Sequence, residues 1–406
     1  MSALARLSLD ELAPAEVTGR RALVRVDFNV PLEGEGAGRR VASDMRIRAA
    51  LPTIRALEER GATVVLASHL GRPKGVPRAD LTMAPVAERL VALIGHEVGY
   101  LPKPFDDRSR ERIRAGGVFL LENLRFDPGE EADDPAFAAR LASLADLFVQ
   151  DAFGTVHRAH ASTVGVTRHL RPNVAGKLVD RELTAFRRLL EEPRRPFVAV
   201  LGGAKISGKL ETVRGLLDRC DRVCLGGGMA NTFLLARGFG IGASLVEPDL
   251  VGEARALLAE RGEAIELPKD FVVAREIESG AETRTIEAGE VAPGWKILDV
   301  GPKTVESFGE RVRSAGTVFW NGPLGVFEIS PFDAGTRDFA ERMAAATEAG
   351  AFTVVGGGDS IAALEGAGRI GDVSHASTGG GAALELVSGS PMPGIEALDP
   401  PRAGKP

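Results

Sequence analysis

The chain has 406 residues, 44% of them hydrophobic and 26% charged, with a formal net charge of −6. This length favours two or three domains, the composition is that of a globular protein with a sizeable core, and the mild acidity gives no overall attraction to nucleic acid or to a membrane surface. Because the N-terminus lacks the apolar run of a secretory signal and no stretch reaches the roughly 18 apolar residues of a membrane-spanning helix, we expect a cytoplasmic protein with no nucleic-acid or membrane partner.

Short apolar runs alternate with segments of helical periodicity along the chain. The runs that we predict as strands are residues 22–28, 63–68, 118–123, 146–152, 197–202, 222–227, 317–322 and 352–357. Helical periodicity is clearest at residues 46–61, 135–145 and 249–262, and the first and last of these end at glycine. This alternation predicts β-α units whose parallel sheets are covered by helices on both faces.

The boundary between two domains is best placed at the charged helix predicted for residues 181–192, which precedes a basic turn bracketed by prolines. We therefore predict an α/β protein of two Rossmann-like lobes, each a mainly parallel sheet with helices on both faces, joined by a hinge helix within residues 181–195. Residues 1–180 form the first domain in this prediction and residues 196–387 form the second. Within the second, residues 277–295 are predicted to form a surface excursion or hairpin.

Polar side chains cluster where the predicted strands of the first half end. They are Asp27, Asn29, His69, Arg72, Arg125, His157 and Arg158, joined by Arg46 at the start of the first long helix. Ligands of open α/β sheets bind outside the carboxyl ends of the strands, and arginine forks suit carboxylate and phosphate oxygens. Because no comparable set of carboxylates follows these strands, the cluster predicts a pocket for a small, highly anionic ligand. The alternative is that the arginines are solvated surface residues.

Glycines cluster where the predicted strands of the second half end. The clusters are Gly202–Gly203 with Lys205 and Lys209, Gly226–Gly228, Asn321–Pro323 with Glu328, and Gly356–Gly358 with Asp359. Glycine lets the backbone approach a phosphate closely, and helix N-termini present free N–H groups to it. Together with the lysines and the aspartate, these clusters predict a nucleotide with its Mg²⁺. The alternatives are tight turns for the glycines and a helix N-cap for Asp359.

Residues 203–209 have the pattern G-x-x-x-x-G-K, which leaves open a degenerate P-loop. A P-loop needs Ser or Thr at the next position as a Mg²⁺ ligand, and here that residue is Leu210. Lys205 and Lys209, four apart at the start of the predicted helix, are expected to face the same side. The patterns G-x-G-x-x-G, G-x-S-x-G and H-E-x-x-H are missing from the sequence, which argues against a dinucleotide, serine hydrolase or zinc protease site. The cysteines at 220 and 224 lack a second pair of ligands, so we expect reduced structural thiols.

Segments in order along nearly the whole chain resemble the signature motifs of the phosphoglycerate kinase family. They are RVDFNVP (25–31), RIRAALPTI (46–54), SHLGRP (68–73), LLENLRF (120–126), QDAFGTVHRAHAS (150–162), LGGAKISGK (201–209), GGGMANTF (226–233), VFWNGPLGVFE (318–328), GGGDS (356–360) and HASTGGGAALEL (375–386). The resemblance extends to about residue 398. Beyond it we expect a disordered tail at residues 400–406.

The resemblance implies a reversible, Mg²⁺-dependent transfer of a phosphoryl group between 1,3-bisphosphoglycerate and ADP, giving 3-phosphoglycerate and ATP, in glycolysis and gluconeogenesis. It implies a monomer whose first domain (1–180) binds the triose acid, whose second domain (196–387) binds the nucleotide, and whose C-terminal segment, about 388–406, packs back on the first. Closure about the hinge helix would bring the two substrates together. The alternative is a non-catalytic nucleotide- and phosphometabolite-binding protein on the same fold.

The resemblance also implies roles for residues in the matching motifs. The triose acid would be bound by Asp27, Asn29, Arg46, His69, Arg72, Arg125 and Arg158. The nucleotide would be bound by Gly203, Ala204, Lys205, Lys209, Gly227, Asn321, Pro323, Glu328, Gly357, Gly358, Asp359 and Ser360, with Asp359 holding Mg²⁺. The catalytic residues would be Arg46, Lys205, Gly380 and Gly381, and the histidines would position or support other groups rather than transfer a proton. Ser360 stands where Thr is frequent in the family and keeps the hydroxyl, so we expect little change from it. Gly208 stands where Asp is frequent, which removes one charge near the phosphates without putting the reaction in doubt.

Overall fold

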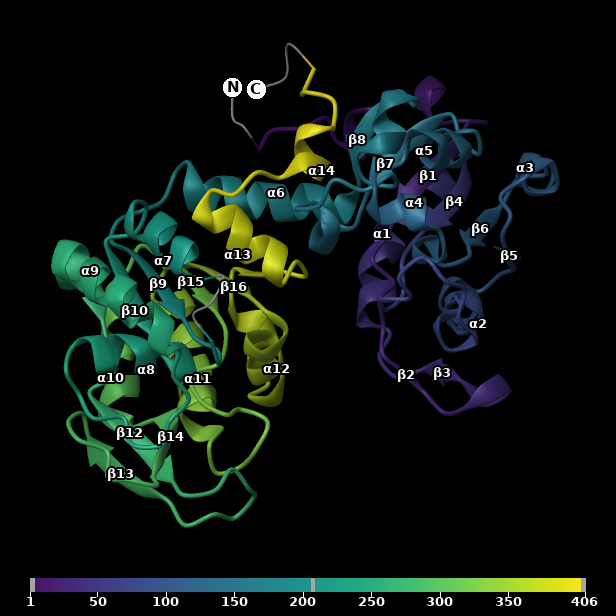
Figure 1. The fold of residues 1–406 in the computed structure, drawn as a ribbon. Coiled ribbons are helices and arrows are strands. Elements are labelled where there is room, and N and C mark those ends of the chain that lie inside the picture. Colours follow the sequence, from purple (N-terminus) through teal and green to yellow (C-terminus); the bar gives the residue numbers. More distant parts are fainter. Residues whose placement is uncertain (1–3, 206–208, 403–406) are drawn as a thin grey trace. The chain divides into compact units, whose positions relative to one another are not determined.

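The computed structural model describes residues 4–205 and 209–402. The described chain divides into two compact units (Figure 1). The first consists of the chain up to Thr184 and from Pro391 onward, and the second is Ala185–Ser390. Within the described residues, the structure has no helix that is both long enough and apolar enough to span a membrane.

The first unit is built on a parallel sheet with the strand order β5-β6-β4-β1-β7-β8. The strands are β1 (Arg21–Arg25), β4 (Thr63–Ala67), β5 (Val98–Leu101), β6 (Val118–Leu121), β7 (Leu147–Gln150) and β8 (Asn173–Ala175), and β2 (Leu32–Glu33) and β3 (Arg40–Val41) form a separate hairpin. Because β1 pairs with β4 on one side and with β7 on the other, the chain changes direction across the sheet at β1. In such sheets the crevice at the carboxyl end of this strand is the usual place for a ligand.

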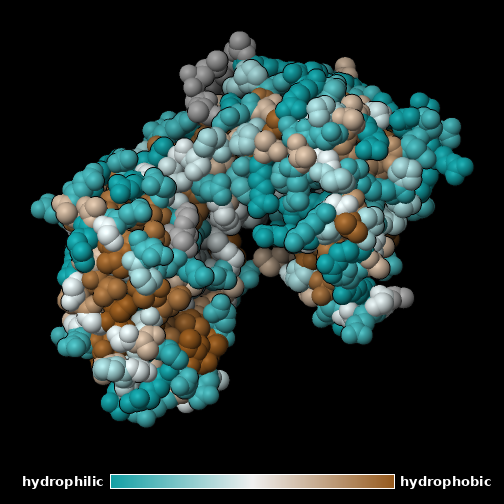
Figure 2. All heavy atoms as spheres, viewed as in Figure 1, coloured by the Kyte–Doolittle hydropathy of each residue, from teal (hydrophilic) through white to brown (hydrophobic). Residues whose placement is uncertain are grey.

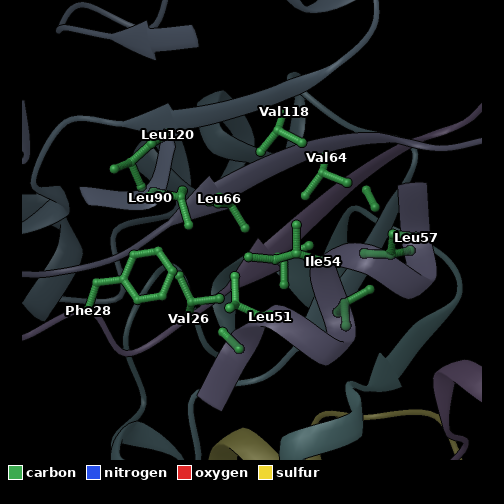
Figure 3. Packing of buried hydrophobic residues seen from close by; sticks show 14 of the residues in the cluster. Val26, Phe28, Leu51, Ile54, Leu57, Val64, Leu66, Leu90, Val118 and Leu120 are labelled. Atoms are coloured by element: carbon green, nitrogen blue, oxygen red, sulfur yellow. The ribbon is translucent and has the colours of Figure 1, made fainter. Parts of the chain in front are cut away.

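The helices of the first unit include α1 and α2, which cover one face of its sheet. The helices are α1 (Met45–Glu59), α2 (Ala84–Ile94), α3 (Asp107–Arg114), α4 (Pro128–Glu131), α5 (Pro135–Ala142) and α14 (Pro393–Glu396), and α6 (Lys177–Leu190) contains the boundary between the units. Figure 3 shows Leu51 and Ile54 of α1 pointing towards Val26 and Leu66 in a cluster of buried side chains. Burying one such side chain contributes roughly 1.5–3 kcal/mol, so this face fixes α1 to the sheet.

The second unit is built on another parallel sheet, with the order β11-β10-β9-β15-β16-β17. Its strands are β9 (Phe197–Leu201), β10 (Arg222–Leu225), β11 (Ile265–Glu266), β15 (Thr317–Asn321), β16 (Phe352–Gly356) and β17 (His375–Ala376). An antiparallel sheet of β12 (Asp270–Ala274), β13 (Arg284–Glu287) and β14 (Lys296–Val300) is added to it. The helices are α7 (Leu210–Leu217), α8 (Gly227–Ala236), α9 (Val251–Arg261), α10 (Pro302–Arg313), α11 (Ala334–Glu348), α12 (Gly358–Gly366) and α13 (Gly381–Ser388).

The C-terminal segment lies against the first unit through backbone hydrogen bonds. Leu7 N–H donates to Asp399 O at 2.8 Å, and Asp399 N–H donates to Asn173 O at 2.9 Å. The expected disorder from residue 400 is not seen at Arg402, whose guanidinium pairs with Glu16 at 2.6 Å. Residues 403–406 of that expected tail lie outside the described residues.

The predicted α/β fold with two mainly parallel sheets is confirmed, and the predicted strands all appear. The prediction missed the short edge strands β5, β8, β11 and β17 and the strands β12 and β14. The third strand of the antiparallel sheet, β13, lies within the surface excursion or hairpin predicted at residues 277–295 and pairs with β12. The helix predicted at 181–192 was placed too late, since α6 begins at Lys177. Thr53 Oγ1 and Asp151 Oδ1 accept its first N–H groups at 2.9 and 3.0 Å, and these partners are distant in sequence.

Candidate active site

The loops that follow β1 and β4 are joined by side chains predicted to bind an anion. The Asp27 carboxylate accepts from Arg46 of α1, with 2.5 Å between Oδ2 and Nη1. Asn29 Oδ1 accepts from Gly71 N–H at 2.9 Å. Gly71 has φ of +61°, and a Cβ there would lie 2.8 Å from a methyl group of Leu81, so this turn requires glycine. These contacts hold Asp27, Asn29 and Arg46 at the carboxyl end of β1.

The loop after β6 is tied to the loop after β4 by the buried side chain of Asn123. Its Oδ1 accepts from the N–H groups of Leu70 and Arg125, both at 3.1 Å, and its Nδ2 donates to Leu70 O at 2.7 Å. Arg125 in turn donates to Gly71 O at 2.8 Å. Its Nε lies 3.1 Å from Glu131 Oε1, an ion pair whose orientation makes no hydrogen bond. Arg125 is therefore brought to the same edge of the sheet as His69.

The basic side chains of the first unit act on one another electrostatically. Burial, followed by the charges of Arg25, Arg125 and Arg46, holds the pKa of His69 well below its usual range. Burial and the nearby guanidinium groups, led by Arg25, lower the pKa of His160 to about 4. Burial lowers the pKa of Arg125 too, and the charges of Arg25 and Arg158 add to that effect. This shared field would attract an anion.

Arg158 and Arg72, which are also predicted to bind the triose acid, are more exposed than Arg125. Arg158 is half-buried and its Nε donates to Nε2 of His157 at 2.9 Å. Arg72, next to Gly71, is exposed.

The expectation that these arginines lack balancing carboxylates was wrong. Asp27 pairs with Arg46, and Glu131 lies against Arg125. Glu130 is fully buried and accepts from Ser162 Oγ at 2.6 Å. The prediction considered the residues at strand ends, whereas the two glutamates come from the short helix α4. Sequence reasoning also missed Arg25, although a charged residue inside an apolar strand could have drawn attention to it.

A cavity of about 450 Å³ lies in the second unit. Of the residues predicted to bind a nucleotide, its lining includes Gly203, Ala204, Gly227, Pro323, Glu328 and Asp359. Much of the remaining lining is apolar, with Leu245, Ile277, Leu298 and Val326 as examples. Figure 2 shows apolar surface gathered on this unit in the region of α8 and β14, elements that contribute to the lining. The cavity thus combines backbone polar groups with an apolar wall, as small-molecule sites usually do.

The loops after β9, β10 and β15 meet main chain to main chain at the edge of this cavity. Gly203 N–H donates to Pro323 O at 2.9 Å. A Cβ at Gly202 would lie 2.0 Å from Pro323 O, and one at Gly228 would lie 2.5 Å from Ala204 O. Side chains at these glycines would push the loops apart. The start of α8 takes part in this packing, since Gly227 N–H donates to Leu324 O at 3.0 Å and Met229 N–H donates to Gly203 O at 3.1 Å.

The expectation that Lys205 and Lys209 share a helix face was wrong, because α7 begins at Leu210. Hydrogen bonds from the β9 loop to neighbouring loops hold Gly203, so the chain does not turn into a helix there. Lys205 is exposed in this loop, and Lys209 Nζ lies 3.4 Å from Gly202 O. Leu210 is buried. Gly208 lies outside the described residues.

The other predicted residues of the second unit lie at the starts of α12 and α13 and at the end of β15. Ser360 Oγ accepts from Gly322 N–H at 2.7 Å, and Asn321 Nδ2 is buried without a hydrogen-bond partner. Gly357 is the N-cap of α12 with φ of +93° and is followed by Gly358, the first residue of the helix. Gly380, with φ of +49°, is the N-cap of α13, which begins at Gly381.

Asp359 is the residue best placed to hold a metal. It is exposed, lines the cavity and is the second residue of α12, so its alternative as the N-cap is wrong. Within residues 4–205 and 209–402, no group of three or more His, Cys, Asp or Glu side chains is close enough to hold a metal. Mg²⁺ is commonly held by one or two carboxylates together with substrate phosphates. Asp359 fits an ion that arrives with a nucleotide.

Asp299 is a buried carboxyl in the cavity wall that sequence reasoning missed. It accepts from the N–H groups of Val300 and Gly335 at 2.9 and 2.7 Å. Burial, with the nearby charges of Asp333 and Asp338, raises the pKa of this carboxyl to about 8.

The parallel sheets, the cluster of basic side chains at the carboxyl end of β1 and the glycine-lined cavity with Asp359 define a small-molecule phosphotransferase. The model of the family described as phosphoglycerate kinase matches residues 12–390. The phosphoglycerate kinase of Chloroflexus aurantiacus is 52% identical over 94% of this chain and 96% of its own, and that of Acaryochloris marina is 49% identical over 98% and 100%. The phosphoglycerate kinase structures from Coxiella burnetii and Pyrococcus horikoshii each match with a TM-score of 0.83, at 38% and 33% identity, over 97% of this chain and 98% of theirs. The chain belongs to the phosphoglycerate kinase family.

Proposed function

We propose that this chain carries out reversible phosphoryl transfer between 1,3-bisphosphoglycerate and ADP, giving 3-phosphoglycerate and ATP, on the residues described above. As a phosphoglycerate kinase it is a phosphotransferase whose acceptor is a carboxyl group, with a role in glycolysis. The observation that supports the assignment of ligands is a contrast in charge. Guanidinium groups converge at the carboxyl end of β1, whereas glycine backbone and the exposed carboxylate of Asp359 border the cavity in the second unit.

The cluster of basic side chains at the carboxyl end of β1 would bind the triose acid. Arg46, Arg125 and Arg158 would pair with its carboxylate and phosphate oxygens, while Asn29 keeps the surrounding loops in place through Gly71. Asp27 orients Arg46 before the ligand arrives. Removing one such preorganised donor commonly lowers kcat by roughly 10²–10³-fold.

The cavity in the second unit would bind the nucleotide. The side chains of Lys205 and Lys209 would meet its phosphates, and Asp359 would hold Mg²⁺. When bound with the nucleotide, Mg²⁺ neutralises charge on the phosphate oxygens. The N–H groups at Gly380 and Gly381 would stabilise the group in transfer.

Phosphoryl transfer in this direction or its reverse needs no general base, because the attacking carboxylate or phosphate oxygen is already ionised. The low pKa values of His69 and His160 agree with this, since both rings would be neutral and weakly basic near pH 7. Because the proposed ligand sites belong to different units, turnover also requires the two ligands to meet. We include closure about α6 in the proposal.

A coupled assay in which ATP, Mg²⁺ and 3-phosphoglycerate are each omitted in turn tests the proposal. We expect ATP consumption when all three are present and none when any is left out. ATP hydrolysis without the triose acid would point instead to a simple NTPase. Binding of both ligands without turnover at any Mg²⁺ concentration would support the non-catalytic alternative.

A further inference from the structure

Arg25 is a fully buried arginine at the end of β1. Its side chain lies on the opposite face of the sheet from Val24 and Val26, which belong to the core under α1. Arg25 is 0% exposed, and its strand neighbours in register are Ala67 of β4 and Gln150 of β7. It therefore lies directly beneath the point where the loops that carry Asp27 and His69 leave the sheet.

The guanidinium of Arg25 has a defined partner in each direction. Nε donates to Ser162 Oγ at 2.8 Å, Nη1 donates to Val26 O, and Nη2 lies 3.2 Å from Nδ1 of His69. Ser162 Oγ in turn donates a hydrogen bond to Glu130 Oε1 at 2.6 Å. Arg25 and Glu130 thus form a buried pair of opposite formal charge bridged by a hydroxyl, which limits the cost of burying the cation.

The contact with His69 has one chemical interpretation. A guanidinium carries N–H donors and no acceptor, and it stays protonated in proteins. Nδ1 of His69 must therefore accept, which leaves it without a proton. A neutral imidazole has one N–H, so the proton resides on Nε2.

We propose that Arg25 is a positioning residue that fixes His69 as the neutral tautomer with its proton on Nε2, so that His69 offers a hydrogen-bond donor to the anionic ligand. The identity of that ligand rests on the proposed function. Ionised carboxylate and phosphate oxygens only accept hydrogen bonds, so the opposite tautomer would turn a lone pair towards them.

The surroundings of His69 support the neutral ring. The groups whose charges act on it are Arg25, Arg125, Arg46 and His160, all of which disfavour a second proton. The ring is 5% exposed, so burial acts in the same direction. Arg25 is the guanidinium in contact with the ring, which is why we assign the choice of tautomer to it.

Nitrogen-15 NMR of histidine-labelled protein tests the tautomer without any ligand. The chain has six histidines, and the resonance lost in His69→Gln identifies the relevant ring. We expect Nδ1 to keep the far-downfield shift of an unprotonated nitrogen from about pH 5 to about pH 8. A protonated Nδ1 in the wild-type protein would overturn the proposal. Because this readout needs no substrate, it is independent of whether the triose acid binds.

Variants at Arg25 test its control over the ring. Arg25→Gln can donate or accept, so we expect a mixture of tautomers and at least about tenfold weaker binding of 3-phosphoglycerate by calorimetry. Arg25→Lys, which only donates, should restore the Nε2–H tautomer. Ser162→Ala, which removes a partner of Arg25 while leaving its contact with His69, should keep that tautomer and serves as the matched control. An unchanged tautomer in folded Arg25→Gln would overturn the proposal, and should that variant fail to fold, the wild-type spectrum decides.

Discussion

Replacement of Asp299 by Asn is expected to remove a pH dependence of stability from the second unit. The carboxyl is 1% exposed, and its pKa is raised from 3.8 to about 8 by burial and by the neighbouring acidic groups. Between these values the folded chain holds a proton that the unfolded chain has lost, so the free energy of unfolding falls as pH rises. The stabilising proton is fully present below about pH 4 and is lost as pH passes through about 8.

The size of the change in the free energy of unfolding follows from the pH range between the two pKa values of Asp299. Each pH unit changes the free energy of unfolding by about 1.4 kcal/mol, which gives roughly 4 kcal/mol between about pH 5 and about pH 8. Asn does not titrate but places an NH₂ group near one of the two N–H donors, Val300 and Gly335, at a cost of about 1–3 kcal/mol. Asp299→Asn should therefore be less stable than the wild type at about pH 5 and equal or more stable at about pH 8.

Urea unfolding followed by tryptophan fluorescence at several pH values provides the measurement. The two tryptophans, Trp295 and Trp320, both lie in the second unit, so the signal reports on that unit and not on Asp151 of the first, whose pKa is also raised, to about 7, by burial. Glu306→Gln, which alters an exposed carboxylate on α10, is the matched control and should follow the wild type closely. If the free energy of unfolding changed with pH in the same way for the wild type and for Asp299→Asn, the reasoning would be refuted, since Asp299 would then be ionised throughout.

Three further substitutions test the assigned roles. Lys205→Ala should lower kcat by roughly 10²–10³-fold in the coupled assay while the Kd for 3-phosphoglycerate stays unchanged, and weak binding with normal turnover would remove Lys205 from its role. Glu131→Gln removes the carboxylate 3.1 Å from Arg125 Nε, so we expect about two- to fivefold tighter binding of 3-phosphoglycerate by calorimetry, and weaker binding would contradict this competition. Gly202→Ala places a Cβ 2.0 Å from Pro323 O, so ATP affinity should fall at least about tenfold, whereas wild-type affinity would mean that the loops are not packed as described.

The strand-end residues could be predicted because they depend on a local pattern. An apolar run ending in a polar residue marks both the strand and the edge where ligands bind, which is how Asn29, His69 and Arg125 were found. Whether they meet could not be read from the same pattern. That depends on Asn123 and Gly71, which join the loops across the sheet.

The residues that were missed depend on contacts between distant parts of the chain. Ser162, the partner of Arg25, lies 137 residues further along the chain. Asp299 is the penultimate residue of a strand of the antiparallel sheet, whose sequence, KILDV, has no long apolar run. The helix α7 begins only at Leu210, so helical spacing misplaced Lys205.

The return of the C-terminal segment to the first unit has a consequence for the newly made chain. Leu7 and Asp399 both pair with β8, the edge strand of the first sheet, through Ala175 and Asn173. During synthesis Ala185–Ser390 is complete before Asp399 is made, so the second unit can fold while the edge of β8 is paired with Leu7 at Ala175 but still open at Asn173. Open edges of this kind pair readily with other chains. Ribosome stalling or proteolysis near residue 390 would therefore leave a protein prone to aggregate through β8, and a chaperone that shields strand edges would be needed most at that moment.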